Sequence, residues 1–146
     1  SAWTTGGVYP VSKQYMGASG IQTAAFCAGG EPGFVTTANT YDGSTWTATG
    51  SLNTGRSFGG SAGTTTEGLY FGGRTPTKVD LTESFNGTSW AVASAMNTAR
   101  DGIAQGWAPG SSDLGVLAMA GQTPPFSLLV EEWDGGGDSV VTLTSS

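Results

Sequence analysis

Side chains that could carry out acid–base or metal chemistry are scarce in this sequence. Histidine, the usual general base and metal ligand, does not occur among the 146 residues. Glu131 and Glu132 are adjacent, and neighbouring side chains in a strand point to opposite faces, so we interpret them as solvated edge charges. With Asp134 and Asp138 they surround three glycines, but this spacing does not follow the calcium-binding loop of an EF-hand. We therefore predict that the chain is not an enzyme and has no metal site or cofactor.

The single cysteine and the basic residues also argue against a reactive or nucleic-acid-binding site. Cys27 lies in an apolar segment, 24–28, with no adjacent cation to activate its thiol, so we expect it to be buried. The net charge is −6, and the five Lys and Arg residues form no run that could follow a phosphate backbone. No apolar stretch approaches the roughly 20 residues of a membrane span. We expect no nucleic-acid partner and no membrane insertion.

The elements that must position any functional residue are short strands. The chain contains 25 Gly and 6 Pro, which favour turns over helices. Its 5 Trp, 6 Phe and 4 Tyr, together with many Thr, suit pleated surfaces. The composition predicts an all-β fold.

An internal repeat organises these strands. Trp3, Trp46 and Trp90 recur 43 and 44 residues apart, and each period contains the same markers in the same order. These are a Gly-rich strand, an apolar strand closed by glycine, a strand ending in an aromatic residue, and the Trp strand. The aromatic residue precedes a hairpin signal each time, at Asp42-Gly43, Asn86-Gly87 and Asp134-Gly135.

Four short antiparallel strands in a period of this length predict a β-propeller blade. We place the repeats at about 3–45, 46–89 and 90–138, with a C-terminal strand at 139–146, in one domain spanning 1–146. A closed barrel or a sandwich also uses short strands, but neither requires these markers to return in one order.

The markers resemble the kelch repeat. The clearest copy contains Leu69-Tyr70-Phe71-Gly72-Gly73, Glu83-Ser84-Phe85-Asn86, Trp90, Met96 and Arg100. The resemblance covers residues 2 to 135 and implies three kelch-like four-stranded blades. The copies depart from the pattern at Ala120-Gly121 in place of the third Gly-Gly, at Gln14 near the first Arg position, and in the missing Trp of the last copy.

The repeated residues are interpreted as structural. The Gly-Gly pairs allow unusual backbone angles at the end of the second strand. The Trp side chains bury large surfaces between blades, and Arg56 and Arg100 are held by carbonyls or carboxylates at the corner between the Trp strand and the next Gly-rich strand. This structural signature comprises Trp3, Trp46, Trp90, Gly29, Gly30, Gly72, Gly73, Arg56 and Arg100.

Three blades leave two uncovered apolar sides, because propellers have roughly four to eight blades. Two chains could form a six-bladed ring, three could interleave in a trimeric shaft, or the chain could belong to a longer product. Counting a strand at Trp3 and another at 139–144 gives one strand more than three blades need. We hypothesise that one terminal strand is exchanged between chains.

The loops between the second and third strands differ most between copies, and variable loops on a rigid frame often bind partners. The candidate contact residues are Phe34, Arg74, Lys78 and Phe126. The alternative is that they cover neighbouring blades.

The Thr/Gly/Ala/Asn-rich texture, with Asn86-Gly87-Thr88-Ser89-Trp90, resembles repeats in bacteriophage tail and virion proteins. This second resemblance implies a non-catalytic structural or interaction module, such as a tail, fibre or decoration protein, located in a virion or outside the cell. Its expected partners are itself, other virion proteins and a host-surface glycan or receptor. The alternatives are a carbohydrate- or receptor-binding propeller and a cellular kelch-type protein-interaction domain. A copper-dependent kelch-type oxidase is disfavoured because the chain has no His.

Overall fold

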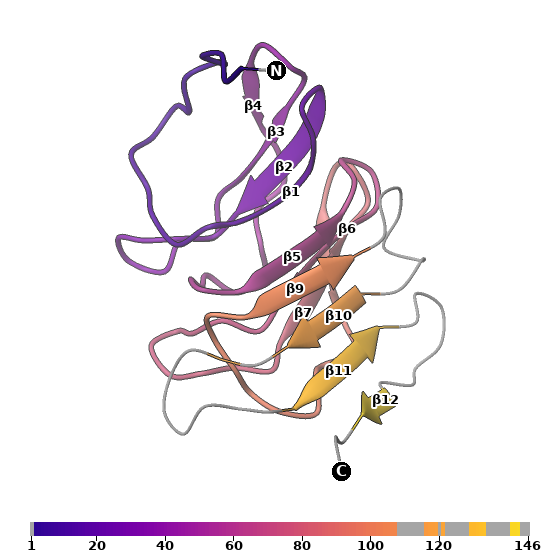
Figure 1. The fold of residues 1–146 in the computed structure, drawn as a ribbon. Coiled ribbons are helices and arrows are strands. Elements are labelled where there is room, and N and C mark those ends of the chain that lie inside the picture. Colours follow the sequence, from indigo (N-terminus) through magenta and orange to yellow (C-terminus); the bar gives the residue numbers. More distant parts are fainter. Residues whose placement is uncertain (1, 108–115, 120, 122–128, 134–140, 144–146) are drawn as a thin grey trace.

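The computed structural model describes residues 2–107, 116–119, 121, 129–133 and 141–143, and all regular elements among them are strands (Figure 1). The strands are β1 (Gly17–Ile21), β2 (Ala24–Ala28), β3 (Ala38–Tyr41), β4 (Trp46–Ala48), β5 (Gly60–Gly63), β6 (Gly68–Phe71), β7 (Thr82–Phe85), β8 (Trp90–Ala93), β9 (Ala104–Trp107), β10 (Val116–Met119), β11 (Val130–Trp133) and β12 (Val141–Leu143). The described residues contain no helix with the length and apolarity that a membrane span requires.

The strands form three four-stranded antiparallel sheets in which sequence neighbours pair. The first sheet contains β1–β4, the second β5–β8 and the third β9–β12, each in chain order. The registers correspond between sheets, since Cys27 pairs with Asn39, Tyr70 with Glu83 and Ala118 with Glu131. The prediction of an all-β chain built of four-stranded antiparallel units is therefore confirmed.

The hairpin signals Asp42-Gly43 and Asn86-Gly87 form the expected turns between the third and fourth strands, while Asp134-Gly135 lies outside the described residues. Gly43 and Gly87 have φ of 100° and 94°, a region that side chains disfavour. Asp42 Oδ1 accepts hydrogen bonds from the amides of Thr45 at 2.7 Å and Ser44 at 2.9 Å. These bonds, with those from the two hydroxyl groups, hold the pKa of the exposed Asp42 carboxyl far below its usual range.

The first strands of the three sheets lie side by side, β5 between β1 and β9 (Figure 1). Small residues make this approach possible, and all four residues of β5, Gly60 to Gly63, are buried. Polar groups bridge the sheets here: Ser19 Oγ donates to the Gly63 carbonyl at 2.9 Å, and Ser61 Oγ donates to the Ala18 carbonyl at 2.8 Å.

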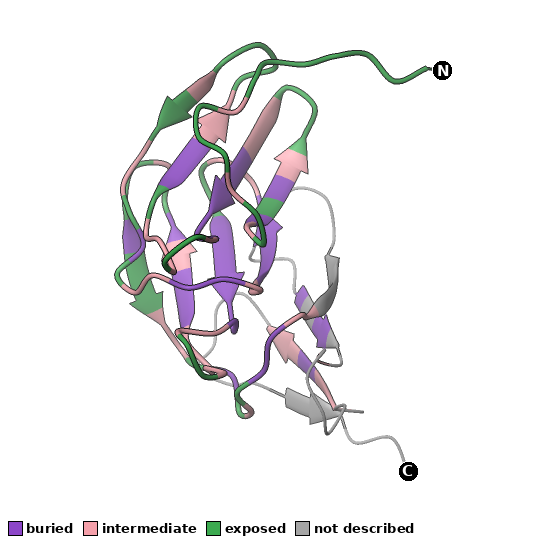
Figure 2. Cartoon of the chain, turned by 90° about the vertical axis from the view of Figure 1, so that its left-hand side faces the viewer, coloured by how far each residue is buried: buried purple, intermediate pink, exposed green. Residues whose placement is uncertain are grey.

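Apolar side chains fill the two spaces between the sheets. Between the first and second, Phe26 from β2 packs edge-on against Trp90, with ring centroids 5.7 Å apart, and Trp90 stacks on Phe85. Burial of a side chain such as Phe26 contributes about 2 to 3 kcal/mol. A second cluster, which includes Leu69, Phe71, Met96 and Val116, joins the second and third sheets. Figure 2 shows the buried residues concentrated along the strands.

The N-terminal segment differs from the sequence-based prediction. Trp3 was expected to mark a strand and to bury its side chain, but it belongs to no strand and is 103% exposed. The segment before β1 is exposed along most of its length and reaches beyond the first sheet (Figure 2). Since Trp46 and Trp90 begin the last strands of their sheets, the structural units span 17–48, 60–93 and 104–143. The predicted C-terminal strand is present as β12, the fourth strand of the third sheet.

Candidate functional site

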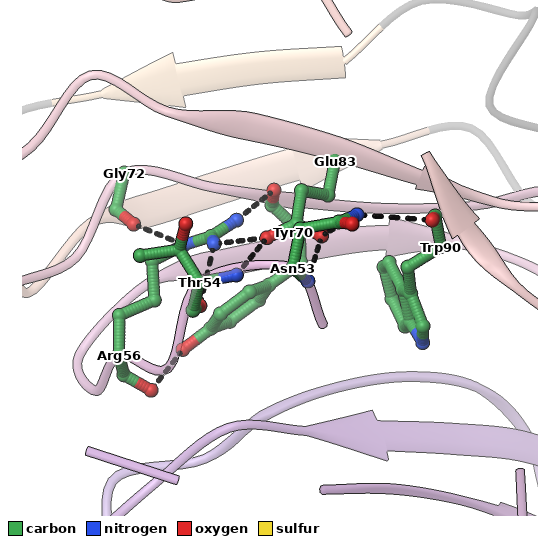
Figure 3. Close-up of polar contacts among 7 residues, drawn as sticks. All are labelled: Asn53, Thr54, Arg56, Tyr70, Gly72, Glu83 and Trp90. Carbon is green, nitrogen blue, oxygen red and sulfur yellow. Dashed lines mark hydrogen bonds and ion pairs between the residues drawn. The ribbon is translucent and has the colours of Figure 1, made fainter. Parts of the chain in front are cut away.

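Arg56 lies at the centre of a polar cluster that ties the segment between the first two sheets to the second sheet (Figure 3). Its Nη1 donates to Glu83 Oε1 at 2.5 Å, its Nε to the Gly72 carbonyl at 3.1 Å and its Nη2 to the Tyr70 carbonyl at 3.0 Å. The guanidinium also lies 4.7 Å from the centroid of the Tyr70 ring. Both charged side chains are almost fully buried. Carbonyls and a carboxylate therefore hold Arg56, as its sequence position suggested.

The Glu83 carboxylate also accepts hydrogen bonds from backbone and side-chain donors of the 51–56 loop. The amide of Asn53 donates to Oε2 at 2.7 Å, its side chain donates to the same oxygen at 2.9 Å, and the amide of Thr54 donates to Oε1 at 3.3 Å. Burial alone would raise the pKa of the Glu83 carboxyl, but the hydrogen bonds from Asn53 and Arg56 outweigh it and lower this pKa. The carboxylate stays charged and fastens the 51–56 loop to β7.

The same cluster recurs between the second and third sheets. Arg100 Nη2 donates to Glu131 Oε1 at 2.5 Å, and the amides of Asn97 and Thr98 donate to the same carboxylate at 2.6 and 3.2 Å. Glu131 was expected to be a solvated edge charge, but it is 2% exposed. The expectation is wrong because Glu131 occupies the register position of Glu83, facing the loop that enters the sheet.

The first sheet has a weaker version of this cluster. Lys13, four residues before β1, takes the position that Arg56 takes before β5, whereas sequence reasoning had placed Gln14 near it. Asn39 replaces Glu83 in register, and its Oδ1 accepts a hydrogen bond from the Tyr9 hydroxyl at 2.8 Å. Lys13 donates to the hydroxyl of Thr37. Burial raises the pKa of the nearby Cys27 thiol, with Tyr9 and Lys13 opposing the shift.

The Gly-Gly pairs lie where each second strand meets the following connection. The amide of Gly30 donates to the Arg56 carbonyl at 2.9 Å, and the amide of Gly73 donates to the Arg100 carbonyl at 2.8 Å. A Cβ on Gly29 would lie 2.4 Å from the Arg56 carbonyl oxygen, and one on Gly72 would lie 2.7 Å from the Arg100 carbonyl oxygen. The glycines are therefore required by close contact as well as by their positive φ.

The candidate contact residues of the loops are partly used within the fold. Arg74 lies 4.2 Å above the Phe58 ring, and its Nε lies 3.1 Å from Asp101 Oδ2. Arg74 thus contacts a residue before the second sheet and a residue after it in sequence, while its part in a contact surface stays a prediction. Phe34 and Lys78 are half-buried on the same loops, and Phe126 lies outside the described residues. Within the described part of the chain, no three His, Cys, Asp or Glu residues gather as metal ligands would.

A groove of about 590 Å³ lies on the outer face of the first sheet and was not foreseen from the sequence. The stacked rings of Tyr41 and Trp46, with centroids 4.8 Å apart, form part of its wall, and residues 2–6 line another part. Trp46 Nε1 donates to the Gly7 carbonyl at 3.2 Å, and the Tyr9 ring meets Trp46 edge-on. We call the stacked Tyr41 and Trp46 rings the Tyr41–Trp46 platform. The aromatic residue before each Asp-Gly or Asn-Gly turn is the sequence signal that could have indicated it.

No family model matches the chain, and no curated protein matches it.

Proposed function

We propose that this chain is a non-catalytic structural and interaction module built of three kelch-like β-propeller blades. The repeated connection between sheets carries the proposal. Each connecting segment places a buried Arg against a Glu on the third strand of the next sheet, as Arg56 does with Glu83 and Arg100 with Glu131. The contacts between the first strands of successive four-stranded sheets support this proposal, because propeller blades also converge through their first strands.

The chemistry of the described residues favours assembly over catalysis. The buried carboxylates of Glu83 and Glu131 are used in contacts between sheets and loops. Each accepts hydrogen bonds from loop amides as well as from an arginine. Groups satisfied in this way rigidify a frame. The frame then presents its loops and its open outer sheet to partners.

We place this module in a bacteriophage particle, as a tail, fibre or decoration protein. This part of the proposal is supported by the Thr/Gly-rich repeat phrases that resemble virion proteins. Its partners would be further copies of the chain, other virion proteins and a host-surface glycan or receptor.

Immunogold labelling of particles from the source that encodes the chain tests this function. An antibody raised against the purified chain should label a fixed position on the tail or capsid. Label confined to cell debris, with unlabelled particles in the same field, would overturn the virion assignment. An antibody absorbed with purified chain is the matched control.

A further inference from the structure

The first sheet and the other sheets differ in how their faces are covered. Between the second and third sheets, a pocket near Phe71 and Val116 has a volume of about 20 Å³. A hollow of about 320 Å³, lined by Thr23, Thr47 and Gly87 among others, lies between the first and second sheets. The outer face of the first sheet carries the groove of about 590 Å³. Close packing is the norm inside proteins, so an open face that carries two stacked aromatic rings, Tyr41 and Trp46, needs an explanation.

The open face carries the same aromatic pair that is covered elsewhere. Phe85 and Trp90 stack at 4.9 Å and are covered by Phe26 from the preceding sheet. Tyr41 and Trp46 occupy the corresponding register positions and stack at 4.8 Å. Tyr9 reaches Trp46 from the connecting segment, but no described sheet supplies the counterpart of Phe26 here.

The segment before the first sheet keeps the contacts of a connection between sheets. A Cβ on Gly7 would lie 2.1 Å from the Ser44 carbonyl oxygen, and a Cβ on Gly50 would lie 2.4 Å from the Thr88 carbonyl oxygen. Gly7 therefore packs against the β3–β4 hairpin in the same way as Gly50 packs against the β7–β8 hairpin. Residues 3–5 then take the sequence place of β4, whose role is to pair with a third strand.

The third sheet is the one that lacks a Trp strand. Its fourth strand, β12, pairs Val141 with Glu132, so the sequence position of Trp46 and Trp90 is taken by Val140. The chain thus has, before its first sheet, a Trp-containing segment that pairs with no described strand, and its third sheet has a fourth strand without the Trp. Trp3 is fully exposed, so its side chain is available to pack against another sheet.

We propose that residues 2–6 pair with β11 of a second copy of this chain, in place of that copy's β12. The third sheet of the second copy then packs on the Tyr41–Trp46 platform. Reciprocal exchange between two chains obeys two-fold symmetry and closes a ring of six sheets. The inference rests on the proposed blade architecture. To that architecture it adds the partner chain, the sheet face that is covered and the segment that is exchanged.

The register of this pairing can be tested by cysteine trapping. In the first sheet Thr47 pairs with Thr40, and the corresponding trans pair is Thr4 with Glu132 of the second copy. Directly opposed residues in antiparallel strands lie about 4.5 to 5.5 Å apart at Cα, within the range of a disulfide. Mixing a tagged Thr4→Cys chain with an untagged Glu132→Cys chain should give a mixed disulfide. Thr4→Cys mixed with Val92→Cys, on the exposed β8 strand, should give none; equal yields in both mixtures would overturn the proposal.

Sedimentation equilibrium of the intact chain supplies the second test. Trp3→Ser should weaken self-association by about tenfold or more, as loss of a buried Trp anchor does. Val92→Ser, which also removes an exposed apolar side chain, should leave it unchanged. Removing residues 139–146 should preserve or strengthen association because it removes the competing strand. Loss of association in that variant, or an unaltered dissociation constant for Trp3→Ser, overturns the exchange.

Small-angle scattering separates this inference from the function on which it rests. A chain that stays monomeric but scatters as a three-sheet array overturns the exchange and leaves the blade architecture standing. A monomer whose scattering does not fit that array overturns both.

Discussion

Arg56 and Glu83 form a buried ion pair with 2.5 Å between Nη1 and Oε1, across a separation of 27 residues in sequence. Arg56 belongs to the segment that leaves the first sheet, and Glu83 to the third strand of the second. The pair therefore fixes how one sheet follows the other. Arg100 and Glu131 repeat the relationship one unit later.

Removing the guanidinium of Arg56 should destabilise the fold strongly. Arg56→Met leaves the Glu83 carboxylate buried without its cation, which costs roughly 3 to 5 kcal/mol. Urea unfolding monitored by Trp fluorescence measures the loss. Lys13→Met, at the corresponding position before the first sheet, should cost about 1 kcal/mol because Lys13 is only half-buried. Equal losses in the two variants would contradict the structural role of the pair.

Glu83 should make the fold sensitive to acid. Its folded pKa lies below the ordinary value of 4.5, so its stabilising effect is complete above pH 4.5 and is lost as pH falls through the folded pKa. The free energy of unfolding of the wild type should therefore approach that of Glu83→Gln as the pH is lowered from 7 to 3. Parallel pH profiles for the two proteins would refute this assignment.

Tyr70 should make the fold sensitive to alkali. Burial raises the pKa of its hydroxyl from 10 to about 12, although the charge of Arg56 opposes the shift. Between pH 10 and 12 the unfolded chain releases this proton while the folded chain keeps it, so stability falls by roughly 3 kcal/mol. Tyr70→Phe should show a shallower decline than the wild type in urea titrations over this range. An identical decline would place the alkaline sensitivity elsewhere.

The steric cost of a side chain at Gly29, which lies close to the Arg56 carbonyl, should be separable from the cost of its positive φ. Gly29→Ala combines a positive φ with a clash against the Arg56 carbonyl, and we expect a loss of about 2 to 4 kcal/mol. Gly33→Ala has a positive φ of 89° but open space around it, so we expect about 1 to 2 kcal/mol. Thermal unfolding of both variants measures the difference. A Gly33→Ala loss as large as that of Gly29→Ala would remove the steric argument.

Cys27 should be unreactive in the folded chain. It is 2% exposed, and burial raises the pKa of its thiol. Modification by Ellman's reagent at pH 8 should be slow in buffer and fast in urea. Rapid native modification would show that the outer face of the first sheet opens in solution.

Several local features were predictable because they depend on neighbouring residues. Asp42-Gly43 and Asn86-Gly87 specified hairpins through positive φ and a side-chain acceptor. The order of the four strands followed from markers that recur at one spacing. The burial of Glu131 could not be read this way, since its partner Arg100 lies 31 residues away and is placed by the packing of two sheets.

By itself, the sequence determined the strand content, the four-stranded unit and the turns, because alternation and turn chemistry act over a few residues. Only the tertiary structure decided which of the repeated residues are buried and paired. Lys13 and Asn39 stand where Arg and Glu stand later, and Trp3 carries the marker of a strand that it does not form. The physical reason is that burial and strand pairing need a neighbouring sheet, and the described chain places no sheet before the first.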